Sequence, residues 1–193
     1  MRNLTTSILT LGMLLATTMS PGAAAEPTAI DRRMVLTIDD LPAQRAPGIP
    51  DVQIEKIMRS LVATLVEQQV PALGLVNEVK LYLDGQVVPE RVALLRHWLE
   101  AGLELGNHTY SHPDLHRTPL PEFVADLSRG EEVSRSLSEA AQRPYRFFRH
   151  PFLHTGRDLE TRRALEATLD RLGYRVAPVT VDNSEWILSL IHI

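Results

Sequence analysis

Apolar residues follow two kinds of pattern along this chain. Short apolar runs rich in β-branched residues and bounded by turn residues predict buried strands. These runs lie at 34–38, 72–79, 103–105, 145–148 and 174–181. Between them, apolar residues recur three or four positions apart, which is typical of amphipathic helices. We expect these helices at 52–69, 89–101, 122–141 and 159–172.

The regular alternation of strands and helices indicates one α/β domain. Strands that alternate with helices favour a parallel sheet whose strands are joined by helical crossovers. Proline or glycine marks three of the boundaries, because Pro71 ends the first helix and Gly102 and Gly173 follow two others. The length of 193 residues and the apolar fraction of 44% suit a globular chain of this kind.

The first 25 residues predict a signal peptide. Arg2 gives a positive start, residues 8–19 are largely apolar, and residues 23–25 are alanines suited to cleavage. The apolar run is short for a membrane span, so we expect no stable span after cleavage. The sequence therefore predicts export to the periplasm or the cell exterior, with an uncleaved N-terminal anchor as the alternative.

Charge and cysteine content exclude several classes of function. The formal net charge is −4 and no basic run could follow a phosphate backbone, so we expect no nucleic-acid partner. The chain has no cysteine, which excludes disulfides, thiolate metal sites and a cysteine nucleophile.

Side chains able to perform chemistry follow four of the predicted strands. In parallel α/β architectures, sites collect at the carboxyl ends of the strands, where the connecting loops meet. An acid pair follows the first strand, a histidine pair the third, and single charged residues the fourth and fifth. These residues are Asp39, Asp40, His108, His112, Arg149 and Asp182. Their shared placement favours a site at this end of the sheet.

The histidine pair points to a metal ion. His108 and His112 are four positions apart, so one helical turn would put both rings on the same side. Pro113 disfavours helical geometry at His112, and a turn is therefore expected there. Neutral imidazoles are common ligands of zinc and related ions. Asp39 or Asp40 could supply a third ligand.

Each of these residues also has an ordinary structural interpretation. An acid pair after a strand is often a turn or a helix cap, and histidine pairs also occur on surfaces. Arg149 could form a structural ion pair, and Asp182 could be a turn residue. The metal site is favoured because all four groups are expected at one end of the sheet.

The remaining histidines give weaker signals. His97 is expected on a helix surface, and His116 could lie near the mouth of the site. His150 and His154 repeat the four-residue spacing, but Pro151 lies between them and no second carboxylate partner is evident. We therefore do not expect these four to bind metal.

The residues of the candidate site resemble the motifs of the polysaccharide deacetylases, the NodB-homology family among the carbohydrate esterases. Residues 37–40, Thr-Ile-Asp-Asp, resemble its first motif, and residues 107–112, Asn-His-Thr-Tyr-Ser-His, resemble its second. Residues 148–152, Phe-Arg-His-Pro-Phe, resemble the third, and residues 182–186, Asp-Asn-Ser-Glu-Trp, the fourth. The motifs occur in family order over most of the chain after residue 25.

The resemblance implies a fold and a metal site. The fold would be a distorted (β/α) barrel with fewer than eight strands, in a domain spanning 26–186 and built here from about five βα units. One divalent ion, zinc in the first place and cobalt, nickel, iron or manganese as alternatives, would be held by Asp40, His108 and His112.

The resemblance also implies a reaction and its participants. The family removes N-acetyl groups from glycans, so the substrate would be an exported polymer or oligomer such as peptidoglycan or chitin fragments. Asp39 would be the general base, Arg149 would orient it, and Asp182 would partner a charged neighbour. The N–H of Phe152 would stabilise the oxyanion, and Trp186 would line the pocket.

The C-terminus departs from the family pattern. The fifth motif of the family supplies a general-acid histidine, and residues 188–192, Leu-Ser-Leu-Ile-His, fit it superficially. However, they follow Trp186 directly, with no room for the intervening helix. The sequence thus reads as a family domain that stops early, with 187–193 as a tail of doubtful origin and His192 as a weak candidate.

Three alternatives to glycan deacetylation remain open. A small-amide deacylase of the same family would use the same residues. An iron oxygenase could use two histidines and one carboxylate, although Asp39 would then have no clear role. An inactive remnant could still bind metal or glycan.

Overall fold

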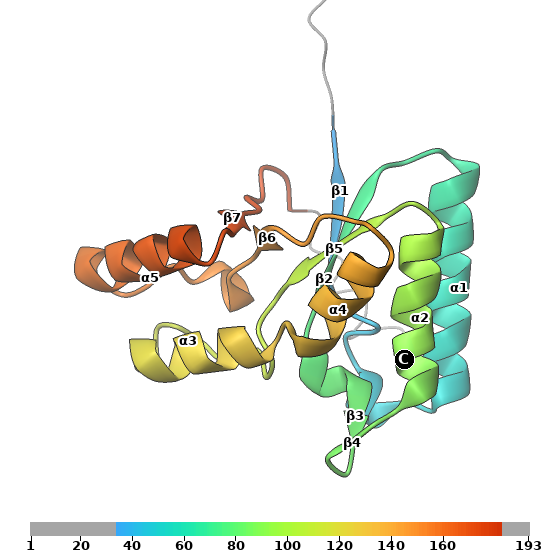
Figure 1. Ribbon diagram of the computed structural model, residues 1–193, viewed down its shortest axis with the longest axis horizontal. Coiled ribbons are helices and arrows are strands. Elements are labelled where there is room, and N and C mark those ends of the chain that lie inside the picture. The colour runs from blue at the N-terminus through green and yellow to red at the C-terminus, as the bar shows by residue number, and fades with distance from the viewer. Residues whose placement is uncertain (1–33, 183–193) are drawn as a thin grey trace, which may run out of the picture. The chain divides into compact units, whose positions relative to one another are not determined.

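A five-stranded parallel sheet forms the centre of the computed structural model, which describes residues 34–182 (Figure 1). The strands are β1 (Leu36–Leu41), β2 (Ala72–Val76), β5 (Glu104–Asn107), β6 (Phe147–Phe148) and β7 (Arg175–Val176). They are ordered β1-β2-β5-β6-β7, and every neighbouring pair is parallel. The predicted α/β fold with parallel strands is therefore confirmed.

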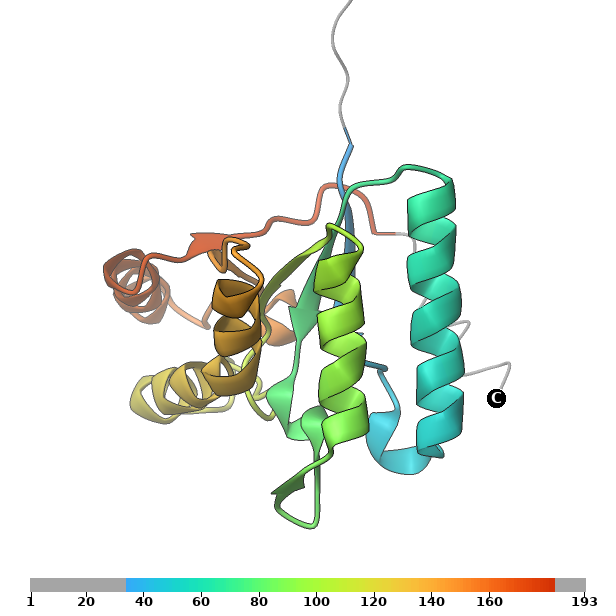
Figure 2. The ribbon, with the colours of Figure 1, turned by 45° about the vertical axis from the view of Figure 1, so that its right-hand side comes forward.

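Helices connect these strands within the described residues. They are α1 (Asp51–Glu67), α2 (Pro89–Glu100), α3 (Leu120–Arg129), α4 (Glu132–Ala140) and α5 (Leu159–Arg171). Short 3-10 helices lie at η1 (Ala46–Gly48), η2 (Glu78–Leu81) and η3 (Pro151–Leu153). Helices α4, α2 and α1 lie in a row (Figure 2), and α2, in the middle, contacts both of the others. Within the described part of the chain, no helix is long and apolar enough to cross a membrane.

Several predicted boundaries are wrong. The helix expected over 122–141 is two helices, α3 and α4, separated at Gly130. The strand expected over 72–79 ends at Val76, and the one expected over 174–181 is reduced to β7. A small antiparallel hairpin, β3 (Tyr82–Leu83) with β4 (Gln86–Val87), was not predicted.

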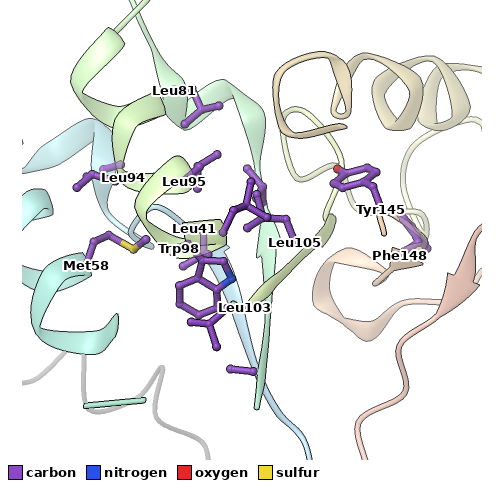
Figure 3. Packing of buried hydrophobic residues seen from close by; sticks show 14 of the residues in the cluster. Leu41, Met58, Leu81, Leu94, Leu95, Trp98, Leu103, Leu105, Tyr145 and Phe148 are labelled. Carbon is purple, nitrogen blue, oxygen red and sulfur yellow. The ribbon is translucent and has the colours of Figure 1, made fainter. Parts of the chain in front are cut away.

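The main core lies between the helices and one face of the sheet. Trp98 and Leu95 of α2 are fully buried there with Leu41 of β1 and Leu105 of β5. Figure 3 shows this cluster beside α2 and the neighbouring strands. A Cβ at Gly74 would lie 2.3 Å from a methyl group of Leu41, so β2 needs glycine here for this packing.

The opposite face of the sheet carries a smaller apolar cluster and the polar residues. Leu73 and Leu75 of β2 pack there against Ala177. Because side chains alternate along a strand, Thr37 and Asp39 of β1 share one face, and both accept hydrogen bonds from Arg149. Asp39 and its arginine partner thus lie on the face opposite the main core.

The break between α3 and α4 positions the histidine segment. A Cβ at Gly130 would lie 2.3 Å from the carbonyl carbon of Thr109 and 2.4 Å from the backbone nitrogen of Tyr110. Only glycine therefore lets this backbone approach so closely. Asp126 of α3 completes the contact, because its carboxylate accepts from the backbone N–H groups of Tyr110 and Ser111.

Alanine at Gly130 is expected to destabilise the protein by about 3 kcal/mol, because the new methyl group meets backbone that cannot move independently. Urea unfolding of Gly130→Ala would measure the change. Gly48→Ala is the matched control, because a Cβ at Gly48 would meet no atom within 4 Å. Equal stability of the two variants would show that the close approach is not required.

Candidate metal centre

The two aspartates lie inside β1, not after it as the sequence predicted. The pairing of β1 with β2 shifts register between Ile38 and Leu41, and Asp40 has a φ of 67°. In a regular strand, neighbouring side chains point to opposite faces. Here Oδ2 of Asp39 lies 3.8 Å from Nε2 of His108, and Oδ1 of Asp40 lies 4.0 Å from Nε2 of His112. The irregular backbone therefore brings both carboxylates to the histidine pair.

His108 is held in one orientation by the backbone. Its Nδ1 lies 2.9 Å from the carbonyl oxygen of Arg149, which can only accept, so Nδ1 carries the proton and Nε2 keeps its lone pair. Burial lowers the pKa of His108, outweighing the attraction of Asp39 and Asp40. The side-chain amide of Asn77 donates to the carbonyls of His108 and Thr109 and fixes the segment from the other side.

His112 comes from an irregular turn, as the sequence predicted. Its backbone N–H donates to the hydroxyl of Thr109 at 3.1 Å, and both residues have positive φ, 61° and 67°. Its ring meets that of His108 edge to face, with centroids 4.9 Å apart. Burial, together with the neighbouring His108, lowers the pKa of His112 to about 4, so the imidazole is neutral at physiological pH.

One carboxylate and two neutral imidazoles thus converge from β1 and the loop after β5. The ligand atoms of Asp40, His108 and His112 all lie within 4.8 Å of one another. This donor set matches sites that hold zinc through three protein ligands and leave a further position open. The residues present therefore fit the divalent ion that the sequence predicted, and a small contraction would bring all three into coordination range.

Lys80 is a part of the site that the sequence analysis missed. Its ammonium lies 2.9 Å from Oδ1 of Asp40, the same oxygen that faces His112, and the residue is only 8% exposed. Burial alone would raise the pKa of Asp40, but the charge and hydrogen bond of Lys80 lower it below its ordinary value. Burial in turn lowers the pKa of Lys80, with partial compensation from Asp40.

Methionine at Lys80 is expected to tighten zinc binding by about tenfold or more, because a cation beside a ligand oxygen repels a divalent ion. In chelator the same variant should unfold more easily, since Asp40 loses its counter-ion. Zinc titration and thermal unfolding of Lys80→Met would measure both effects, with the exposed Lys56→Met as control. Weaker zinc binding would instead show that Lys80 mainly orients the carboxylate.

Arg149 holds the second aspartate. Its Nη1 donates to Oδ1 of Asp39 at 2.6 Å and to the hydroxyl of Thr37 at 2.8 Å, while Nε donates to the carbonyl of Ala177 at 3.2 Å. The guanidinium is buried, whereas the Asp39 side chain is 32% exposed. Asp39 is therefore fixed on one side and open to solvent on the other.

Of the remaining predicted site residues, Phe152 is placed beside the histidine pair by a contact in the structure. Phe152 lies in η3 with a φ of 57°, and its ring contacts that of His112 edge to face with centroids 4.5 Å apart. Asp182 is exposed, and its role beside a charged neighbour stays a prediction. Trp186 and His192 lie outside the described residues, as does the predicted signal peptide.

Two of the histidines that gave weaker signals in the sequence, His150 and His154, have different surroundings. His150 is buried, contacts the ring of Phe148, and has no part in the cluster around Asp40. His154 does have a carboxylate partner, contrary to the sequence analysis, because its Nδ1 lies 2.7 Å from Oδ1 of Asp114. The forty positions between these two residues hide the pair from any local pattern.

Burial of His150 predicts a loss of stability in acid. Burial lowers the pKa of His150 from 6.5 to about 4. Between pH 6.5 and pH 4, His150 is therefore protonated in the unfolded chain and neutral in the folded chain. Its contribution is complete above pH 6.5 and is lost as the pH falls towards 4, by an amount on the order of 3 kcal/mol. Urea unfolding in chelator at several pH values should therefore show a shallower acid decline for His150→Gln than for His97→Gln. Parallel curves would contradict this.

The family model described as polysaccharide deacetylase matches residues 26–177. The chain belongs to this family. The resemblance found in the sequence is thereby confirmed. A search of curated proteins finds no match.

Solved structures of polysaccharide deacetylases share the fold. A family 4 carbohydrate esterase from Streptomyces lividans, in complex with acetate, is 22% identical with a TM-score of 0.57, covering 83% of this chain and 69% of its own. Peptidoglycan deacetylase PdaC from Bacillus subtilis is 21% identical with a TM-score of 0.55, covering 80% and 62%. A family pseudoenzyme from Bacillus anthracis is 20% identical with a TM-score of 0.56, covering 80% and 45%.

The similarity to these structures shows the fold of this chain and does not show its activity. The chain spans only about half the length of the pseudoenzyme and its mutants, 45–47%. One neighbour is described as a pseudoenzyme, so the shared fold does not by itself show that a protein is catalytically active. The function must therefore be inferred from the residues around Asp40.

Proposed function

We propose that this chain is a metal-dependent deacetylase that removes N-acetyl groups from an exported glycan. Asp40, His108 and His112 would hold one divalent ion, zinc in the first place, and Asp39 would act as the general base. The observation that supports this most strongly is the convergence of these three ligands within 4.8 Å of one another, with a second, arginine-bound carboxylate beside them.

The chemistry that amide hydrolysis needs is matched by the residues present. A divalent ion in such a site lowers the pKa of water towards neutrality and polarises the carbonyl of an amide. Asp39 keeps Oδ2 on the side of His108, while Arg149 occupies Oδ1. Oδ2 is therefore the oxygen that would accept the proton of the attacking water and pass it towards the leaving amine.

Arg149 keeps the base in place rather than reacting itself. Its contacts with Thr37 and the carbonyl of Ala177 fix the guanidinium independently of Asp39. The N–H of Phe152 is proposed to meet the charge that develops on the carbonyl oxygen, as its motif position implies. Phe152 lacks a tyrosine hydroxyl, so this chain offers one polar group fewer to the substrate than the family motif does.

The substrate class rests on the family. Among the structural neighbours, one is called a peptidoglycan deacetylase and another a carbohydrate esterase, which supports peptidoglycan or chitin-type oligomers with N-acetyl groups. A small amide is the second candidate, because the described residues contain no feature that selects a polymer. Export through the predicted signal peptide would place the enzyme with its glycan.

Acetate release tests this proposal. Purified protein supplied with Zn²⁺ should release acetate from N-acetylglucosamine oligomers or peptidoglycan, lose this activity in chelator, and regain it when the ion returns. Release without oxygen would exclude the iron oxygenase. Zinc-loaded protein that releases no acetate from any of these substrates would favour a metal- or glycan-binding remnant and contradict the proposal.

A further inference from the structure

A second group of side chains with the donor atoms for a metal ion includes a histidine whose ring lies near that of Phe152. Asp114 and His116 come from the loop after β5, and His154 comes from the end of η3. Their ligand atoms all lie within 4.8 Å of one another. The ring of Phe152 contacts both His112 and His154, with centroids 4.5 Å and 5.8 Å away.

The three side chains are already joined to one another. Oδ1 of Asp114 accepts from the backbone N–H of His116 at 2.8 Å and lies 2.7 Å from Nδ1 of His154. The rings of His116 and His154 stack with centroids 3.9 Å apart and planes 6° from parallel. The Asp114 side chain is 19% exposed and that of His154 is 38% exposed, so an ion can reach them from solvent.

We propose that Asp114, His116 and His154 form a second divalent-cation site that takes zinc or a similar ion. One carboxylate oxygen and two imidazole nitrogens are the donor set that such ions prefer. The ion would replace the direct contact between Oδ1 of Asp114 and Nδ1 of His154. The proposal does not depend on the proposed function, because none of these residues belongs to the Asp40 cluster.

Binding requires one rearrangement. A metal ion lies in the plane of an imidazole that binds it, so two stacked parallel rings cannot both bind one ion as they stand. His116 is the ring that must turn, since the Asp114–His154 pair already has donor and acceptor close together. His116 lies in an irregular loop and is partly exposed, so rotation about its side-chain bonds is open to it. Arg117, 82% exposed and 3.6 Å from Asp114, can move away from the ion.

A bound ion would link two loops that are far apart in sequence. The loop after β5 carries His112, and η3 carries Phe152. Joining them through Asp114, His116 and His154 would stabilise the folded form over the unfolded chain, in which the three ligands are dispersed. The site is therefore expected to raise the temperature of unfolding when zinc is added, even where Asp40 has been replaced.

Counting bound zinc tests the second site. Tag-free protein is dialysed against excess Zn²⁺, and zinc per chain is measured by mass spectrometry for wild type, Asp40→Ala, His116→Ala, His154→Ala and the control His97→Ala. We expect two ions in wild type and His97→Ala, and one ion in each of the other variants. Asp40→Ala should still show zinc-dependent thermal stabilisation, and adding His154→Ala to it should remove both the stabilisation and the last ion.

The outcomes separate this proposal from the proposed function. A single ion in wild type that disappears in Asp40→Ala would overturn the second site and leave the deacetylase site standing. A single ion that survives Asp40→Ala and disappears in His154→Ala would support the second site and contradict the first. Two ions retained in both His116→Ala and His154→Ala would overturn the second site. Thermal unfolding in chelator confirms that each variant is folded.

Discussion

Alanine at Asp40 is expected to abolish binding of the divalent ion at the catalytic site and, with it, acetate release. In the proposed site Asp40 would supply the anionic ligand beside two neutral imidazoles, so its loss would remove both a bond and the charge that offsets the ion. The affinity should fall by more than the roughly 10- to 100-fold that follows loss of a group merely supporting a ligand. Competition with a coloured chelator would measure this fall, with acetate release measured in parallel.

The matched control for Asp40→Ala is Asp84→Ala. Asp84 lies in the exposed turn between β3 and β4, and its replacement should leave zinc affinity and acetate release unchanged. Asp40→Ala also removes the partner of Lys80, so the variant should be checked for folding in chelator. Zinc bound at the catalytic site with wild-type affinity in Asp40→Ala would remove this residue from the ligand set.

Asparagine at Asp39 is expected to separate metal binding from turnover. Asn keeps the shape of Asp but cannot take up a proton, so acetate release should fall by about 10²- to 10⁴-fold. Zinc affinity should change little, because Asp40, His108 and His112 remain in place. Steady-state rates and zinc titration of Asp39→Asn would be compared with those of the wild type.

The reverse pattern would overturn the division of roles between the two aspartates. If Asp39→Asn lost the ion bound beside His108 and His112 while Asp40→Ala kept that ion, Asp39 would be the ligand and Asp40 the candidate base. Asp170→Asn, an exposed change on α5, serves as the control for replacing a carboxylate by an amide. Loss of activity in that control would show that the assay responds to charge alone.

Much of the fold and site could be predicted from local patterns. The order of strands and helices follows from hydrophobic periodicity, and the rule that loops meet at the carboxyl ends of parallel strands brings Asp40, His108 and His112 together. The placement of Asp39 and Asp40 within β1 was missed because it depends on a register shift against β2. That shift is a pairing property of two strands separated by α1, and the sequence of β1 alone does not contain it.

Other misses arise from contacts between distant segments. Gly130 interrupts a continuous helical pattern because the backbone at Thr109 must pass close to it. In the sequence, Lys80 cannot be told from an ordinary surface lysine. In the structure, η2 places its ammonium beside Asp40, forty positions away in the chain. One miss was avoidable, since Asp84-Gly85 is a strong local signal for a two-residue hairpin turn, and both residues have positive φ.

Location of the bound ion tests the central claim most directly. A crystal structure of zinc-loaded protein, with anomalous scattering recorded at the zinc edge, would place the ion without reference to activity. We expect a peak with one oxygen of Asp40 and one nitrogen each of His108 and His112 at about 2.0–2.2 Å. A zinc-loaded crystal with no peak between these three side chains would contradict the account.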